Sequence, residues 1–88
     1  MVIYKTTNII NGKIYIGKDK HNNPQYLGSG KILKQAISKY GRESFKKDIL
    51  EVCDSLDSLS TQEKYWIKKF NTTDPGVGYN ISEGGDGG

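Results

Sequence analysis

The feature that most constrains the fold is a pair of short strand-forming runs separated by an asparagine-glycine dipeptide. Residues 2–7 and 13–16 are rich in β-branched and aromatic side chains, and the dipeptide at 11–12 lies between them. An Asn-Gly pair favours a tight turn with positive φ, so the two runs predict a β-hairpin. Because side chains alternate faces along a strand, Tyr4 and Tyr15 can meet on one face if the register centres on the turn.

The rest of the chain predicts two helices and a third strand. Apolar residues recur at helical spacing over 31–40, with residues 29–30 near the N-cap and Gly41 placed to stop the helix. Residues 45–52 predict a strand, and a second helix is predicted over 60–70. We therefore expect an α/β (α+β) fold, in which a small, mostly antiparallel three-stranded sheet is flanked by helices.

Length and composition limit this fold to one small domain with a modest core. The chain has 88 residues, and 34% of them are hydrophobic. A domain of this size buries only about two-thirds of its unfolded surface. The single cysteine, Cys53, can form no internal disulfide and is expected to be a buried small hydrophobe. The predicted core consists of Ile3, Ile14, Ile16, Ile32, Leu33, Ala36, Ile37, Phe45, Ile49, Leu50, Trp66, Ile67 and Phe70.

One carboxylate lies within the apolar stripe of the predicted second helix. Glu63 shares this stripe with Leu59, Trp66, Ile67 and Phe70. A carboxylate directed toward an apolar layer is costly unless it is paired or bound to a cation. The alternative is a capping box, because Ser60 and Glu63 match the Ser-x-x-Glu pattern in which the glutamate reaches back to the N-cap amide. The local pattern alone favours the capping box over a metal ligand.

Four landmarks along the chain together resemble the GIY-YIG nuclease family. They are Val-Ile-Tyr at 2–4, Tyr-Ile-Gly at 15–17, Glu-Lys-Tyr-Trp-Ile at 63–67 and Gly-Tyr-Asn-Ile at 78–81, with Val2 in place of the first glycine. Paired tyrosines alone would indicate only cross-strand packing, but all four landmarks occur in the family order. The resemblance implies a metal-dependent DNA endonuclease of homing type that hydrolyses phosphodiester bonds. We expect the last landmark to form a short returning strand.

The resemblance also implies roles for the landmark residues. Glu63 would hold one divalent ion, Mg²⁺ or Mn²⁺, which on this basis favours a metal ligand over a cap. Tyr4 or Tyr15 would contact or deprotonate the attacking water, and the family favours the first of the two. A free phenol has a pKa of about 10, so nearby cations are needed to lower it. Asn80 would hold the site together through hydrogen bonds to the hairpin.

The chain departs from the family pattern where an arginine that clamps the scissile phosphate is expected. The corresponding position is near Tyr26, and no arginine precedes Arg42. Lys18 is similar to a lysine in the excinuclease branch of the family and is the first candidate for the clamp. Lys31 is the second, because it combines an ammonium group with a helix N-terminus. The predicted DNA contacts are Lys18, His21, Lys31, Lys34 and Arg42.

The charge distribution is compatible with a DNA partner. The formal net charge is +3, with a pI of about 9.0, and lysines gather in the N-terminal half. Two alternatives stay open: a nucleic-acid-binding module that kept the fold but lost cleavage, and a generic α/β domain whose tyrosines only pack.

The predicted domain boundaries, together with the lack of targeting patterns, indicate the partners and the location to expect. Residues 1–82 are predicted to form the catalytic domain, and 83–88 a glycine-rich tail or the start of a linker to a separate or missing DNA-recognition module. No apolar run approaches the roughly twenty residues that span a membrane, and the N-terminus lacks a secretion signal. We therefore expect no membrane partner and an intracellular protein, in the cytoplasm of a host cell or near its nucleoid.

Overall fold

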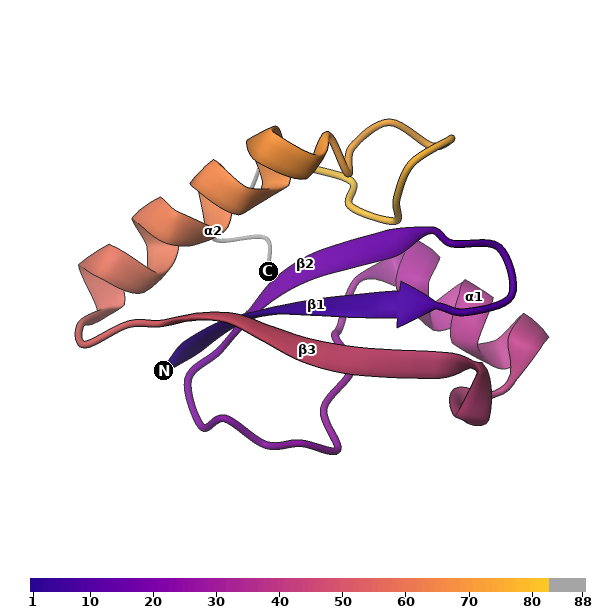
Figure 1. Ribbon diagram of the computed structural model, residues 1–88, viewed down its shortest axis with the longest axis horizontal. Helices are drawn as coiled ribbons and strands as arrows, with labels where there is room; N and C mark the ends of the chain where they lie inside the picture. The colour runs from indigo at the N-terminus through magenta and orange to yellow at the C-terminus, as the bar shows by residue number, and fades with distance from the viewer. Residues whose placement is uncertain (83–88) are drawn as a thin grey trace.

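The fold is a three-stranded sheet with a helix on each face. The computed structural model of the protein describes residues 1–82. The strands are β1 (Val2–Asn8), β2 (Ile14–Asp19) and β3 (Phe45–Val52), and the helices are α1 (Lys31–Tyr40), the short 3₁₀ turn η1 (Arg42–Ser44) and α2 (Leu56–Phe70). The sheet is antiparallel in the order β2-β1-β3. Figure 1 shows α2 running alongside β2, with α1 behind the strands. The predicted fold class is confirmed.

The hairpin register places the two tyrosines on one face of the sheet. Tyr4 pairs with Gly17 and Thr6 pairs with Tyr15. Tyr4 and Thr6 share a face of β1 because they are two residues apart, so Tyr15 lies on that face as well. The predicted hairpin is therefore confirmed.

Each helix covers its own hydrophobic cluster. The cluster on the α1 side contains Tyr4, Tyr15, Leu27, Leu33, Ala36, Phe45 and Tyr79. The cluster on the α2 side contains Ile3, Ile16, Cys53, Leu59 and Ile67, with Met1, Leu50, Trp66 and Phe70 packed against it. The central strand β1 supplies both clusters because its side chains alternate between the two faces.

The predicted tight Asn-Gly turn is wrong, because the connection between β1 and β2 is five residues long. Of the two turn residues only Gly12 has a positive φ, of 79°. The Asn8 side chain accepts a hydrogen bond from the Ile10 amide, and the Asn11 side chain accepts one from the Lys13 amide. These side-chain bonds stabilise a longer loop in place of a two-residue turn.

The second helix starts earlier than predicted, and this excludes the capping box. Helix α2 begins at Leu56, and its N-cap is Ser55, whose hydroxyl accepts a hydrogen bond from the Ser58 amide. Ser60 lies one turn inside the helix, so Glu63 is not in a position to cap the helix start. The burial of Glu63 needs another explanation.

The predicted returning strand at 78–81 is also wrong. Gly78 forms one isolated bridge to Ile14, and no strand follows it in the described chain. Within residues 1–82, the backbone of this segment pairs with β2 only at Ile14, through Val77 and Tyr79, and at Ile16 the side chain of Asn80 takes over the pairing. The expected tail or linker at 83–88 lies outside the described residues.

The core prediction was correct for most aliphatic residues and wrong for two. Ile32 and Ile49 are 42% and 47% exposed, because Ile32 lies on the outer side of α1 and Ile49 lies on an edge strand. Cys53 is buried and free, as expected. None of the helices within residues 1–82 combines the length and the apolar character that crossing a bilayer requires. The buried hydrophobic residues missing from the prediction are Val2, Tyr4, Tyr15, Leu27, Leu59 and Tyr79.

Candidate active site

Most of the predicted site residues converge on the outer strand β2. Tyr15 and Lys18 belong to β2 itself, Tyr4 comes from the neighbouring strand, Glu63 from α2, and Asn80 from the segment after α2. Lys18 lies on the face of β2 opposite to Tyr15, because side chains alternate along the strand. The site therefore includes groups from both faces of the sheet, and they meet at β2.

The two tyrosines form a buried, tilted pair. Their ring centroids are 6.4 Å apart, and their exposures are 1% for Tyr4 and 3% for Tyr15. The Tyr4 ring lies over Gly17, where even a Cβ atom would collide with the phenol. This close approach explains why a glycine follows the second tyrosine motif.

Burial raises the pKa values of both phenols. It raises the pKa of Tyr15 to about 12, with further contributions from Tyr26 and Glu63. It raises the pKa of Tyr4 well above its usual range, and Tyr15, Tyr26 and Asp19 add to the effect. Both side chains are therefore neutral phenols near pH 7, which can donate or accept a hydrogen bond.

Glu63 is a buried carboxylate beside a lysine. The residue is 2% exposed, and its Oε1 lies 3.9 Å from Nζ of Lys18, which is 24% exposed. A buried carboxylate is costly without a cation, and Lys18 supplies positive charge at this site.

The donor set around Glu63 limits the kind of metal ion that fits. In the described part of the chain, no group of three or more His, Cys, Asp or Glu side chains gathers to hold an ion. Mg²⁺ is commonly held by one or two carboxylates, with waters and substrate phosphate oxygens completing its shell. One buried carboxylate beside β2 fits an ion that is bound together with a phosphate substrate.

Asn80 attaches the end of the described chain to the edge of β2. Its Oδ1 accepts a hydrogen bond from the Ile16 amide at 2.9 Å, and its Nδ2 donates one to the Ile16 carbonyl, also at 2.9 Å. The side chain thus satisfies both backbone groups of the residue between Tyr15 and Gly17. It fixes the strand that carries the second tyrosine motif.

The predicted cations lie at different places around this centre. Lys31 is the first residue of α1, next to Gly30, against which the Tyr15 ring packs closely. His21 is exposed and lines an open pocket together with Lys18 and Lys20.

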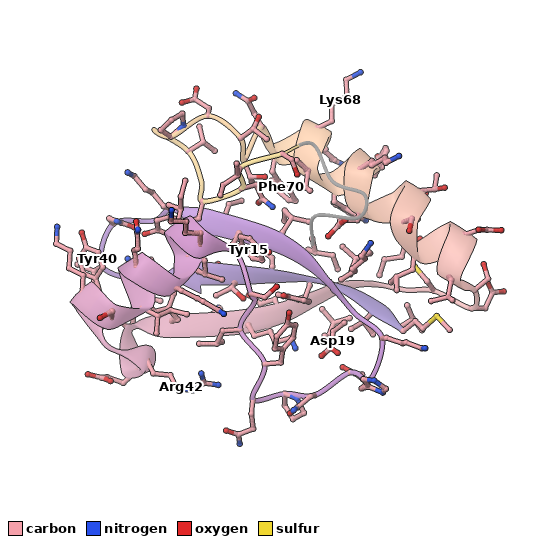
Figure 2. The ribbon with its side chains drawn as sticks, turned by 180° about the vertical axis from the view of Figure 1, so that it is seen from behind. Tyr15, Asp19, Tyr40, Arg42, Lys68 and Phe70 are labelled. Carbon is pink, nitrogen blue, oxygen red and sulfur yellow. The ribbon has the colours of Figure 1, made fainter. Side chains whose placement is uncertain are left out.

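Lys34 and Arg42 lie further from the tyrosines. Lys34 is exposed on α1. In Figure 2, Arg42 lies beyond the end of α1, well apart from both Tyr15 and Asp19. The structure does not bring Arg42 into the tyrosine cluster.

Sequence reasoning missed three side chains that surround Tyr4. Tyr26 packs edge-on against it, with ring centroids 5.9 Å apart. Nζ of Lys47 lies 4.4 Å from the Tyr4 ring centroid, and Lys47 pairs with Asp19. The Asp19-x-x-x-Asn23 spacing at the end of the hairpin was the available signal, because aspartate commonly accepts hydrogen bonds from the amides that follow it. Lys47 gave no signal, since its strand showed no clear alternation.

These features define a class of nuclease domain. The chain matches the model of the GIY-YIG catalytic domain over residues 1–80, and it belongs to the GIY-YIG family of endonuclease catalytic domains. The family is generally dependent on divalent metal ions. The resemblance inferred from the four landmarks is thereby confirmed.

Particular relatives support the same assignment. The chain is 47% identical over 87 residues to the putative endonuclease segB of Enterobacteria phage T4, covering 97% of this chain and 39% of segB. Endonuclease segA of the same phage is 37% identical over 87 residues, again covering 97% and 39%. The chain thus spans about two-fifths of the length of these curated relatives.

A solved structure has the same fold over nearly the whole chain. A mutant of the catalytic domain of intron endonuclease I-TevI superposes with a TM-score of 0.79 at 26% identity, covering 94% of both chains. A second structure, of the catalytic domain of homing endonuclease I-TevI, gives a TM-score of 0.68 at 30% identity, covering 92% of this chain and 97% of that one.

Proposed function

We propose that this chain hydrolyses phosphodiester bonds of DNA as the catalytic domain of a homing-type endonuclease, with one Mg²⁺ or Mn²⁺ ion at Glu63. The observation that carries the proposal is the convergence on β2 of two phenols, a buried carboxylate beside a lysine, and the asparagine that fixes the strand. The family match and the endonuclease relatives support it.

The proposal gives each side chain a distinct task. Glu63 holds the ion, which when bound neutralises charge on the phosphate and assists departure of the 3′ oxygen. Tyr4 and Tyr15 begin as neutral phenols and orient the attacking water and the phosphate through hydrogen bonds. Lys18 places its ammonium next to Glu63, where it stabilises the negative charge that grows on the phosphate. Asn80 keeps the second tyrosine motif in place.

The remaining cations are assigned to binding of the DNA backbone. Lys18 is the first candidate for the missing phosphate clamp, because it lies beside Glu63. Lys31 is the second, because it begins α1 directly after Gly30, which packs against the Tyr15 ring. A lysine binds phosphate as a point charge, without the two parallel bonds of an arginine. His21, Lys34 and Arg42 would contact DNA further from the scissile bond.

Cleavage of supercoiled plasmid with Mg²⁺ or Mn²⁺ tests this function. Wild type should nick the plasmid, Glu63→Ala should abolish nicking, and Tyr4→Phe should greatly reduce it. Glu43→Ala is the matched control, because Glu43 is an exposed glutamate of η1 and its loss should leave cleavage unchanged. Wild type that binds DNA but never nicks it with either ion would contradict the proposal and favour the binding module.

A further inference from the structure

The side chain of Lys47 is an unusual buried cation on the tyrosine face of the sheet. It is 7% exposed, and its Nζ lies 3.2 Å from Oδ2 of Asp19, whose side chain is 6% exposed. The same Nζ donates a hydrogen bond of 2.7 Å to the carbonyl of Asn23. Lys46, the neighbouring residue on the strand, is 64% exposed and pairs with Asp48, which is itself 45% exposed.

Asp19 organises the loop that follows β2. Its Oδ1 accepts a hydrogen bond from the His21 amide at 3.0 Å, and its Oδ2 accepts one from the Asn23 amide at 2.6 Å. Burial raises the pKa of this carboxyl, but the hydrogen bonds from Asn23, Lys47 and His21 outweigh it and hold the pKa below its ordinary value. Asp19 and Lys47 together fix both an amide and the carbonyl of Asn23.

The loop held in this way carries Tyr26, which covers Tyr4. Their rings meet edge to face with centroids 5.9 Å apart, and after burial the side chain of Tyr26 is among the groups that raise the pKa of Tyr4. Lys47 lies near both rings, 4.4 Å from the centroid of Tyr4 and 5.8 Å from that of Tyr26. Tyr26 is less buried than Tyr4 and lines the open pocket that also contains Lys18 and His21. It therefore separates the buried phenol from that pocket.

We propose that the Asp19–Lys47 ion pair positions Tyr26, and that Tyr26 in turn orients the hydroxyl of Tyr4 for the reaction. The proposal rests on the function proposed above and adds three positioning residues to it. The Asp19–Lys47 pair contacts a loop amide, a loop carbonyl and a tyrosine ring. These contacts exceed what an ion pair needs if it contributes only to stability. Breaking one partner of such a pair leaves the other charge buried and uncompensated, which displaces the loop.

The test compares Lys47→Met with Lys46→Met, which removes the same charge from the neighbouring position of the same strand. Lys47→Met should speed hydrogen exchange at the His21 and Asn23 amides at least about tenfold, because both amides bond to Asp19. It should lower kcat by about 10- to 100-fold while KM for plasmid changes by less than about threefold, because the lost interaction orients a reacting group. Lys46→Met should change neither exchange nor kcat.

Tyr26→Phe keeps the inference testable even if Lys47→Met fails to fold. It removes one hydroxyl and leaves the ion pair intact, so it should lower kcat by about tenfold or more without faster exchange at His21 and Asn23. An unchanged kcat in Tyr26→Phe would overturn the inference, as would an unchanged kcat in a folded Lys47→Met.

The outcomes also separate this inference from the proposed function. Wild type that nicks plasmid and loses nicking in Glu63→Ala, together with unaffected positioning variants, overturns the inference alone. Wild type that never nicks plasmid overturns both. A rise in KM with constant kcat in Lys47→Met would show that Lys47 contacts DNA and does not position Tyr26. That result would also overturn the inference.

Discussion

The two faces of the sheet are built from different chemistry although one strand supplies both. The α1 face holds the phenols of Tyr4 and Tyr15 and the buried Asp19–Lys47 pair. The α2 face is almost entirely apolar, with Trp66 and Phe70 packed against aliphatic side chains, and Glu63 is a buried charge near the edge strand β2. Both faces bury apolar side chains, and the α1 face in addition orients a buried ion pair and two phenols. We expect substitutions of the apolar residues to lower stability, and substitutions around Glu63 and the phenols to lower activity.

The largest effect should come from Glu63, the buried carboxylate on the α2 face. Glu63→Gln keeps the size of the side chain but removes its charge, and it should lower the cleavage rate at least about 10³-fold, since a metal ion stabilises a transition state by several kcal/mol. Plasmid nicking and urea unfolding, with Glu43→Gln as control, measure both properties. A large loss of stability without loss of cleavage would place Glu63 among the structural residues.

The next largest effect should be a loss of stability on the α2 face. Ile67 is 2% exposed, and Ile67→Ala should lower the free energy of unfolding by about 2–5 kcal/mol through the cavity it leaves. Ile49→Ala is the control, because Ile49 is 47% exposed and should cost much less. Equal losses for the two variants would show that burial in the α2 cluster adds no stability beyond that of an exposed edge position.

A smaller effect on stability, but a clear one on activity, is expected at Gly17. A Cβ atom there collides with the Tyr4 phenol, so Gly17→Ala should cost about 1–3 kcal/mol through overpacking and should also impair cleavage. Gly12→Ala is the comparison, because a Cβ at Gly12 meets no atom within 4 Å and strains only the backbone at φ 79°. It should cost about 1 kcal/mol and leave the cleavage rate of the folded protein unchanged. Equal cleavage by the two variants would contradict the role of the close approach.

The smallest effect should be the acid dependence of stability that comes from the α1 face. The folded pKa of Asp19 lies below the ordinary value of 3.8, so its stabilisation is present above that value and is lost as the pH falls through the folded pKa. Urea unfolding between about pH 5 and pH 2 should therefore show a shallower acid decline for Asp19→Asn than for wild type. Asp54→Asn, at an exposed aspartate, should decline as wild type does. Parallel curves of stability against pH for Asp19→Asn and wild type would contradict a stabilising role of the Asp19–Lys47 ion pair.

The sequence was sufficient for the parts of the fold that depend on local pattern. The β-branched runs on either side of the first turn predict the hairpin strands. The helical spacing of Leu33 and Ala36 predicts α1. The start of α2 was not predictable in the same way, because Ser55, Ser58 and Ser60 all offer a possible cap. The packing of Leu59 against the sheet favours the earlier start, and that contact is tertiary.

The candidate site was predictable only where a motif marked it. Tyr4, Tyr15, Glu63 and Asn80 carry the family pattern, and the chain brings them to one strand. Lys47 has no such mark, because a lysine in a strand normally reaches solvent. Its burial depends on Asp19, a partner 28 residues away in the sequence, and no local rule links the two positions.

The side-chain bonds from Asn80 to Ile16 join positions 64 residues apart. A ribosome releases the chain from its N-terminus, so both tyrosine motifs emerge long before the asparagine that fixes the second of them. The hairpin is exposed to the cell while its outer edge is still without this partner. The nascent domain therefore acquires the contact that fixes its second tyrosine motif only when synthesis has passed residue 80.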